Sequence, residues 1–539
     1  MLACAAMLSV NASAQKNVKA PEPVLPLPEQ KQVDWQKMET YAFIHFGLNT
    51  FNDREWGYGD SDPKTFNPTH LDCEQWVKTL IAAGMKGVIF TAKHHDGFCL
   101  WPFEGNDYNV SKSPWRGGKG NVVRELADAC KKYGLKFAVY LSPWDRSRAE
   151  YATPDYLPYF YAQLRDLLTN YGEVFEVWFD GANGGDGYYG GAKDQRTIDR
   201  KNYYNYPRIF EILDEIQPNA VVFGDGGPGC RWVGNEKGFA GETNWSFLRK
   251  GEVYPGYPRH TELTYGHADG NQWTAAECDV SIRPGWFYHP EEDGRVKSPE
   301  QLVDLYYRSV GHNATFLLNF PVDRDGLIHP IDSANAIAYH NIIQRELSNN
   351  LVAGMKARVS SERGGQFTAK ALTDNSWDTY WATPDGVTTG DIEFRFKKAQ
   401  RMNRIMLQEY IPLGQRVKKF SVEYLDNKGQ WQTVEQPEET TTIGYKRLLR
   451  FATVVSKGIR VRILDSRGPL CINNIGVYDG GKDAQLTWSK AAESIKSLPF
   501  TVVKKTADEV IIDLGEAKDI TTLQYLPDQS EHRKGLVHT

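Results

Sequence analysis

Short apolar runs alternate with amphipathic stretches from about residue 34 to residue 348, and this alternation strongly constrains the fold. Runs with strand character are residues 41–45, 87–91, 136–141, 174–179, 220–223 and 315–318. Helical periodicity lies between them, at residues 71–83, 122–133 and 155–171. Repeated strand–helix units predict an α/β fold with parallel strands, and a (β/α)8-like barrel over residues 34–348 is the common closed solution. A doubly wound open sheet is the alternative, although no G-x-G-x-x-G follows the first strand.

The pattern changes near residue 355. Short alternating runs follow, separated by turn residues, at residues 392–396, 405–410, 419–424 and 459–463. They predict an antiparallel β-sandwich over residues 356–478. Residues 480–539 contain two more strand-like runs, 509–514 and 520–525, and predict a partial further β-module.

The N-terminal residues resemble the end of a secretory signal. Residues 1–14 are small and apolar and end in Ala12-Ser13-Ala14, an A-x-A cleavage pattern. Residues 15–33 are rich in Pro, Gln and Lys and predict a linker. We therefore expect an exported bacterial protein, periplasmic or attached to the cell surface. The 7 cysteines are scattered without a CxxC pair, which favours free buried thiols.

Composition excludes two classes of partner. The formal net charge is −5 and there is no long basic run, so we expect no nucleic-acid binding. Beyond the N-terminal segment, no stretch reaches the roughly 18 consecutive apolar residues of a membrane span. Aromatic residues make up 12% of the chain, which fits a carbohydrate-handling surface.

The stretch 173–184, EVFEVWFDGANG, predicts a buried strand that ends in an acid and a glycine turn. Alternation places Trp178 and Asp180 on one face, with Val177 and Phe179 on the other. An aromatic wall beside a carboxylate suits a sugar ring and an oxocarbenium-like centre. A plain Asp-Gly turn is the other interpretation of these residues.

Polar clusters also follow the first two strands. His45 ends the first strand, and Glu55 and Trp56 follow it. His94 and His95 end the second strand, where adjacent side chains share one pocket only at a bulge or strand end. Histidine and aspartate at a barrel mouth can also bind zinc, so a metal-dependent hydrolase using His94, His95 and Asp180 is an alternative.

A retaining glycosidase needs a second carboxyl group about 5 Å from its nucleophile, with a raised pKa. Three glutamates follow the fifth strand: Glu236, Glu242 and Glu277. Spacing alone does not choose among them. An aromatic loop at residues 281–288 contains Trp286, which could wall an apolar part of a substrate, while ordinary packing is favoured for Phe287.

Six of these motifs, in one order, match a known family. They are FIHFGLNTF at 43–51, EWG at 55–57, TAKHHDGFCLW at 91–101, EVWFDGANG at 176–184, CRWVGNEKG at 230–238 and SIRPGWFYH at 281–289. Across residues 34–345 the chain resembles the α-L-fucosidases of glycoside hydrolase family 29. Residues 356–478 more loosely resemble a discoidin-like (coagulation-factor type C, family 32 carbohydrate-binding) sandwich, with binding and spacer roles both open.

The family resemblance implies a retaining double displacement on a fucosylated glycan, without a cofactor or catalytic metal. Its nucleophile corresponds to Asp180. Positions that contact fucose in the family correspond to His45, Glu55, Trp56, His94, His95, Trp178 and Trp286.

The acid/base is implied by a second, narrower resemblance. The segment R-W-x-G-N-E-x-G resembles the subgroup acting on α-1,3- and α-1,4-linked fucose, and its acid/base corresponds to Glu236, with Glu277 as the runner-up. The alternatives are a broad-specificity or α-1,2-active enzyme and a catalytically inactive sugar-binding homologue.

Overall fold

The computed structural model describes residues 18–435, 437–481, 501–506 and 510–515. The expected signal segment and the strand-like run 520–525 lie outside the described residues. The described residues up to 481 belong to one compact unit, which contains the barrel and the sandwich. A second unit contributes an antiparallel hairpin of β20 (Thr501–Lys505) and β21 (Val510–Asp513).

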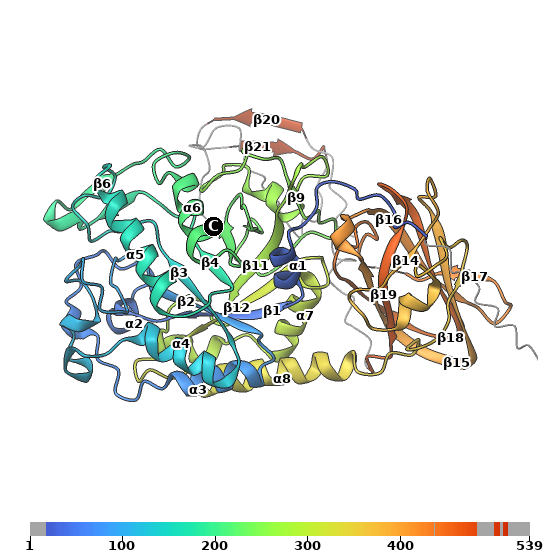
Figure 1. The fold of residues 1–539 in the computed structure, drawn as a ribbon, viewed down its shortest axis with the longest axis horizontal. Helices are drawn as coiled ribbons and strands as arrows, with labels where there is room; N and C mark the ends of the chain where they lie inside the picture. The colour runs from blue at the N-terminus through green and yellow to red at the C-terminus, as the bar shows by residue number, and fades with distance from the viewer. Residues whose placement is uncertain (1–17, 436, 482–500, 507–509, 516–539) are drawn as a thin grey trace, which may run out of the picture. The chain divides into compact units, whose positions relative to one another are not determined.

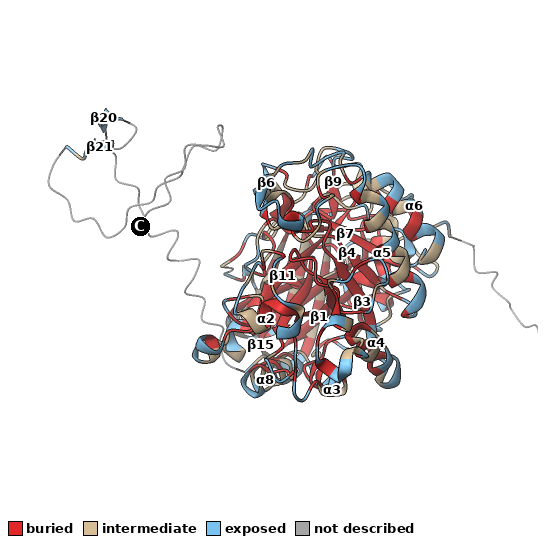
Figure 2. Cartoon of the chain, turned by 90° about the vertical axis from the view of Figure 1, so that its left-hand side faces the viewer, coloured by how far each residue is buried: buried red, intermediate tan, exposed pale blue. Residues whose placement is uncertain are grey.

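Eight parallel strands close into a barrel, so the barrel prediction is confirmed and the open sheet is wrong (Figure 1). In order around the barrel they are β1 (Thr40–His45), β12 (Thr315–Pro321), β11 (Ala275–Ser281), β8 (Cys230–Trp232), β7 (Val221–Gly224), β4 (Glu176–Trp178), β3 (Lys136–Leu141) and β2 (Gly87–Lys93). Buried residues are concentrated on these strands (Figure 2).

Two barrel strands, β8 and β11, were not expected from the sequence. Strand β8 has three residues and includes Arg231, and strand β11 includes Glu277 and Asp279. All three charged residues are buried. Arg231 is satisfied by polar groups, since its Nε donates to Leu263 O at 2.9 Å and its Nη2 to Asn244 Oδ1 at 2.8 Å. Interior charges therefore interrupt the apolar pattern that would reveal a strand.

Six long helices surround the barrel: α3 (Cys73–Ala82), α4 (Val122–Tyr133), α5 (Tyr156–Asn170), α6 (Tyr206–Ile216), α7 (Pro299–Ser309) and α8 (Pro330–Glu346). Their ends follow ordinary capping rules. Asp72 caps α3, Asn121 caps α4, and Gly134 ends α4 with a φ of 74°. Two short helices, α1 (Gln30–Gln36) and α2 (Leu48–Asn52), flank β1.

The helical ring is incomplete beside β7 and β8. Only residues 225–229 connect these two strands, and residues 233–274 contain β9 (Phe247–Leu248), β10 (Gln272–Trp273) and a 3-10 helix. Within residues 225–274, all of which the structure describes, there is no α-helix. This part of the outer wall is therefore covered by irregular chain.

The antiparallel sandwich predicted from the sequence is also confirmed. Its strands pair in the order β14-β19-β15-β18-β16-β17, and β13 pairs with β15. They are β13 (Arg358–Val359), β14 (Trp381–Ala382), β15 (Gly390–Glu409), β16 (Val417–Leu425), β17 (Trp431–Thr433), β18 (Arg447–Ser466) and β19 (Cys471–Tyr478). The apolar core of this domain is separate from that of the barrel.

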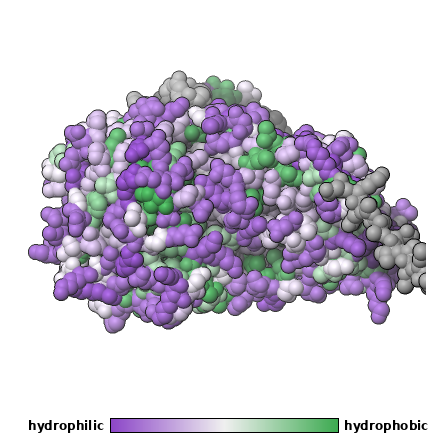
Figure 3. Space-filling view, in the orientation of Figure 1, coloured by the Kyte–Doolittle hydropathy of each residue, from purple (hydrophilic) through white to green (hydrophobic). Residues whose placement is uncertain are grey.

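Two further expectations concern the thiols and the membrane. All six cysteines among the described residues are free and buried, as expected. None of the described helices has the length and apolar character needed to cross a bilayer. The face drawn in Figure 3 is mostly hydrophilic, with hydrophobic residues in small scattered groups.

Candidate active site

Trp178 forms an aromatic floor inside the barrel. Its ring stacks on Phe223 at a centroid distance of 4.0 Å and on Tyr140 at 5.3 Å. Val177 and Phe179 pack in the separate apolar layer outside the strands. The alternation expected for this strand is therefore confirmed, with the indole facing the barrel interior.

Asp180 follows β4 at the carboxyl end of the strand, where barrel enzymes carry their chemistry. Tyr140 Oη donates to its Oδ2 at 3.1 Å, and the backbone N–H of Ala182 donates to its Oδ1 at 2.7 Å. His95 Nε2 lies 3.7 Å from the same Oδ2. Burial, with a smaller contribution from the charge of Glu236, raises the pKa of Asp180 to about 7 despite the hydrogen bonds it accepts. The hydrogen bonds therefore fix the orientation of the carboxylate, but they only partly offset the effect of burial on its pKa.

Three histidines lie together beside Asp180. The ring centroids of His94 and His95 are 4.1 Å apart, and those of His45 and His94 are 5.6 Å apart. Both adjacent histidines enter the site because they follow a register irregularity at the end of β2, between Thr91 and Lys93. Burial lowers the pKa of His45 and of His95 to about 3. These rings are therefore neutral at physiological pH.

The ring nitrogens of these histidines differ in their partners. His45 Nδ1 is 2.8 Å from Asn319 Oδ1, and His95 Nδ1 is 2.7 Å from Ser142 Oγ. His94 Nδ1 is buried and has no hydrogen-bond partner among the described residues. A buried nitrogen without a partner is costly, so this atom is available to a ligand hydroxyl.

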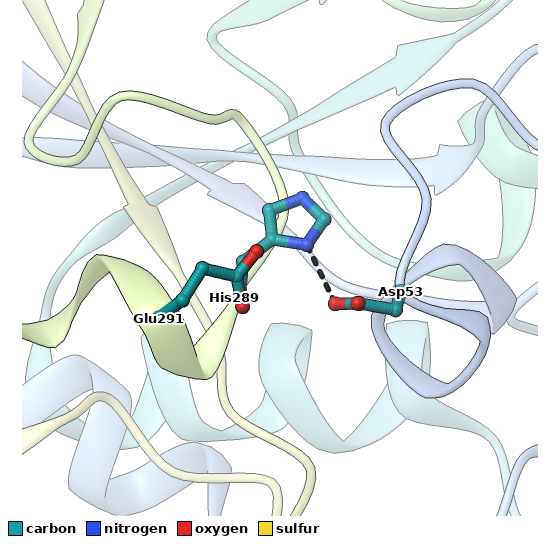
Figure 4. A group of neighbouring side chains, drawn as sticks. All are labelled: Asp53, His289 and Glu291. Carbon is teal, nitrogen blue, oxygen red and sulfur yellow. Dashed lines mark hydrogen bonds and ion pairs between the residues drawn. The ribbon is translucent and has the colours of Figure 1, made fainter.

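Glu55 holds the aromatic loop that follows β11. It accepts hydrogen bonds from the backbone N–H of Trp286 at 2.8 Å and of Phe287 at 3.0 Å. His289 bridges two acids, with Nε2 at 2.8 Å from Glu55 Oε1 and Nδ1 at 2.7 Å from Asp53 Oδ1, the contact drawn in Figure 4. Burial lowers the pKa of His289, but the two carboxylates outweigh it and the net pKa is raised.

Two tryptophans from different segments complete the walls. Trp286 lies 5.3 Å from the ring of His45, centroid to centroid, and 6.4 Å from Phe43. Trp56 is 53% exposed and its ring lies 5.2 Å from that of His95. The sequence-predicted aromatic residues therefore surround the histidines, and Trp56 stays open to solvent.

The structure separates the three candidate glutamates. Glu236 keeps contact with solvent and accepts a hydrogen bond from Trp286 Nε1 at 3.3 Å. Partial removal of its carboxyl group from water, with a smaller contribution from the charge of Glu55, raises its pKa. Glu242 instead faces the sandwich and accepts from the backbone N–H of Glu439 at 2.8 Å. Of Glu236 and Glu242, only Glu236 contacts a residue of the site around Asp180, namely Trp286.

Glu277 lies beneath the aromatic floor. It is completely buried, accepts a hydrogen bond from Trp178 Nε1 at 2.8 Å, and is bonded to Tyr41 Oη. Burial and the neighbouring Glu176 raise its pKa well above the usual range. This carboxyl group supports the indole from below and does not face the mouth.

Side chains that could bind a metal ion gather at two places in the described part of the chain, neither of which includes Asp180. Three potential ligand atoms lie within 4.8 Å of one another in the groups Asp53–His289–Glu291 (Figure 4) and Glu176–Cys230–Glu277. His94, His95 and Asp180 form no such group among the described residues. His95 Nδ1 is also occupied by Ser142. The arrangement around Asp180 therefore gives the zinc alternative no support.

Sequence reasoning missed several residues of the site. Tyr140, Ser142 and Asn319 each contact a residue that was predicted. Tyr140 and Ser142 lie at the end of the third predicted strand, so the barrel rule for strand ends could have found them. Asn319 is on β12, one residue beyond the predicted end of that strand.

Comparison with known proteins agrees with this geometry. The α-L-fucosidase family matches residues 24–338, and the F5/8 type C domain family matches residues 356–475. Alpha-L-fucosidase 1 of Arabidopsis thaliana is 41% identical over 469 residues, covering 85% of this chain and 88% of the relative.

Two solved structures show the same two-domain arrangement. A glycoside hydrolase 29 family member from a rumen bacterium shares 45% identity with a TM-score of 0.76, covering 90% of this chain and 82% of its own. A Ruminococcus gnavus GH29 fucosidase in complex with fucose shares 33% identity with a TM-score of 0.76, covering 87% of this chain and 97% of its own. With a matching barrel, a matching second domain and relatives along most of its length, this chain belongs to the α-L-fucosidase family of glycoside hydrolases.

Proposed function

We propose that this fucosidase removes terminal α-L-fucose from glycans by retaining double displacement, with Asp180 as nucleophile and Glu236 as acid/base. The observation that carries the proposal is the position of Asp180. Its carboxylate is held by Tyr140 and by the N–H of Ala182, beside three buried histidines and above an aromatic floor. A fixed, partly desolvated carboxylate suits attack on an anomeric carbon.

The two steps follow from these roles. In the first, an oxygen of Asp180 bonds to the anomeric carbon while Glu236 gives its proton to the departing glycosidic oxygen. In the second, Glu236 takes a proton from water, which attacks the same carbon and releases Asp180. Fucose leaves with its original α configuration, because the carbon is inverted twice.

Glu236 fits the acid/base role better than Glu277. A group that protonates a leaving glycan must meet both solvent and substrate, and Glu236 is exposed beside Trp286. Glu277 lies under Trp178 with its two oxygens engaged by Tyr41 and by the indole. The raised pKa of Glu236 keeps it protonated closer to neutral pH, as an acid requires.

The remaining predicted residues form the fucose pocket in this proposal. His45, His94 and His95 bond the sugar hydroxyls as neutral rings, so they place no positive charge beside an oxocarbenium-like centre. Trp178, Trp286 and Trp56 offer apolar faces to the ring C–H groups. Glu55 acts through the loop that it holds and through any hydroxyl that reaches its oxygens.

The proposed preference for a particular fucose linkage rests on the segment that carries Glu236. Its resemblance to the α-1,3/1,4 subgroup leads us to propose Lewis-type branches as substrates of an exported enzyme. Fucose release from a Lewis-type trisaccharide, measured beside release from 2′-fucosyllactose, tests this. Release from the Lewis sugar alone is expected, whereas equal or preferred release from the 2′-linked sugar would contradict the linkage.

Glu236→Ala tests the acid/base role separately. General acid/base assistance is worth roughly 10²–10⁴-fold, so turnover of natural glycans should fall by that factor. An aryl fucoside with a good leaving group should lose little in the first step, and azide should restore turnover because it needs no general base. The same behaviour in Glu277→Ala, with normal kinetics in Glu236→Ala, would move the role to Glu277.

A further inference from the structure

A large cavity lies beside β7 in the wall of the barrel, and its lining includes Phe223, on which Trp178 stacks. Its volume is about 950 Å³. Its walls come from α6, from residues 250–255, from the loop 225–229 and from the chain before and within α1. This volume is near the upper end of the ~300–1,000 Å³ found for small-molecule sites.

The cavity exists because the barrel has no helix between β7 and β8. The connecting loop 225–229 instead folds back along the outer wall, with Gly229 N donating to Val222 O at 3.1 Å. A side chain does not fit at Gly226 of this loop, since a Cβ there would meet Val253 O at 2.5 Å. The space that a crossover helix normally fills is thus left open above a tightly packed loop.

The walls combine aromatic faces with polar groups of balanced charge. Tyr206, Phe210, Tyr254 and Trp273 line the cavity. Its charged lining residues are two lysines and two acids, Lys201, Lys250, Glu29 and Asp225. Aromatic faces suit the C–H surface of a hexose ring, and this balance favours a neutral ligand over an acidic one.

Two buried polar atoms of the lining have no partner. Tyr206 Oη and Trp273 Nε1 are both shielded from solvent and make no hydrogen bond within the described part of the chain. The residue Trp273 is only 3% exposed. Both atoms are sealed from solvent, so they lie behind the cavity surface and would reach a ligand only after this wall shifts.

The cavity also reaches the segment that carries Asp180. Strand β7 lies between β4, which precedes Asp180, and β8, which precedes Glu236. Asp225 lines the cavity and is in contact with the nucleophile segment, since a Cβ on Gly181 would meet Asp225 Oδ1 at 2.5 Å. Tyr206 also lines the cavity, and its ring lies 6.3 Å from that of Phe179, next to Asp180 in the chain.

We propose that this cavity is a second carbohydrate site, which binds the neutral hexose chain that carries the fucose. A branched substrate would place its fucose over Trp178 and its main chain across the rim into the cavity. Stacking on Tyr254 and on the other aromatic side chains of the lining would hold that chain. The inference rests on the proposed function, because it assigns the non-fucose part of the same substrate.

The first test uses a glycan that the enzyme does not cleave. Lacto-N-tetraose, a neutral tetrasaccharide without fucose, is titrated into the full-length protein by calorimetry. We expect saturable binding that Tyr254→Ala weakens by about fivefold to tenfold, while the control Tyr265→Ala leaves it unchanged. Tyr265 is 52% exposed and lies outside the cavity lining. Absence of binding, or binding unaffected by Tyr254→Ala, would overturn the proposal.

A second test separates this site from the fucose pocket. Free L-fucose at saturation should leave tetrasaccharide binding intact, and displacement would place the tetrasaccharide in the fucose pocket and refute the inference. In kinetics, Tyr254→Ala should reduce kcat/KM for a fucosylated pentasaccharide by the same factor and leave an aryl fucoside unchanged. Turnover of the aryl fucoside reports on the proposed function alone, so the two claims can fail independently.

Discussion

The mouth of the barrel and the contact between barrel and sandwich each contain a carboxylate that is largely removed from water. The pKa of the first is raised and that of the second is lowered. At the mouth, burial raises the pKa of Asp180 to about 7. At the domain contact, the side chain of Glu438 is buried more deeply, 3% exposed against 23% for Asp180, yet its partners outweigh burial and lower its pKa to about 2. The difference lies in the partners.

Glu438 has two basic side chains within hydrogen-bond distance. Its Oε2 is 2.9 Å from His312 Nε2 and accepts from Arg447 Nη2 at 3.0 Å. Arg447 is fully buried and also donates to the carbonyls of Glu242 at 2.8 Å and Glu439 at 2.9 Å. Asp180, by contrast, has neutral hydrogen-bond donors and a neutral histidine.

The contact continues through polar groups of both domains. Asn244 N donates to Thr442 Oγ1 at 2.8 Å, and Ser246 N donates to Gln415 Oε1 at 2.8 Å. These bonds anchor the stretch of barrel chain that follows Glu236. Glu438 thus sits at the domain contact with basic partners that lower its pKa, whereas Asp180, the proposed nucleophile, has neutral partners and a raised pKa.

Asp180→Asn should produce the largest change in the comparison. Loss of a nucleophile costs on the order of 10⁴-fold or more in kcat. Stability at pH 8 should stay equal or rise, because asparagine removes the cost of a buried charge. Kinetics with an aryl fucoside and a thermal melt measure both, and near-normal turnover would contradict the assignment.

Arg447→Ala should show the opposite pattern to Asp180→Asn, with a large loss of stability and little change in activity. Removing one partner of a buried ion pair leaves a charge uncompensated, so we expect a loss of about 3–5 kcal/mol in the free energy of unfolding. The catalytic constants of the folded enzyme at low temperature should change little. Lys418→Ala is the control, since its pair with Asp465 is exposed and worth at most about 1 kcal/mol. Equal losses in the two variants would refute the buried contact as a stability site.

The two regions should also respond to pH in different ranges, the mouth through activity and the domain contact through stability. Asp180 must be ionised to attack, so kcat/KM should fall about tenfold per pH unit below pH 7. The folded-state pKa of Glu438 is depressed, so its stabilising effect is complete above about pH 4.3 and is lost as the pH falls toward 2. The enzyme should thus stay folded near pH 5, as circular dichroism would show, while kcat/KM falls to roughly 1% of its value at high pH. Unfolding that coincides with loss of activity would contradict this.

Tyr140→Phe gives the smallest expected effect. The tyrosine hydroxyl stabilises the charged form of Asp180, so its loss should move the acid limb of the pH profile to higher pH. A hydrogen bond to a charged group is worth about 1.5–3 kcal/mol, so kcat/KM at pH 7 should fall roughly tenfold. Tyr161→Phe, whose hydroxyl bonds the carbonyl of Tyr204 away from the site, should leave the profile unchanged. An unmoved acid limb in Tyr140→Phe would count against Asp180 as the titrating group.

The local pattern of the sequence predicted much of the barrel but not its irregular side. Strand β3 and helix α4 have the bounds expected from apolar periodicity. Strands β8 and β11 escaped detection because buried Arg231 and Glu277 break that periodicity. Hydrophobic pattern records which residues avoid water, and it does not identify charges that are buried with partners.

The site was predicted as a set of residues but not as an arrangement. Strand-end rules brought His45, His94 and Asp180 to one mouth, as the barrel confirms. The sequence did not reveal where Glu277 lies, because only the fold places it beneath Trp178. The pairing of His312 with Glu438 spans 126 positions of the chain, and no local signal predicts such a contact.

The measurement that tests the central claim most directly is to trap the intermediate. The enzyme is incubated with 2-deoxy-2-fluoro-L-fucosyl fluoride, digested, and its peptides are mapped by mass spectrometry. We predict a single fucosyl adduct on the peptide that contains Asp180, absent from Asp180→Asn. An adduct on another carboxylate, or release of β-fucose as the first product from a normal substrate, would contradict a retaining mechanism at Asp180.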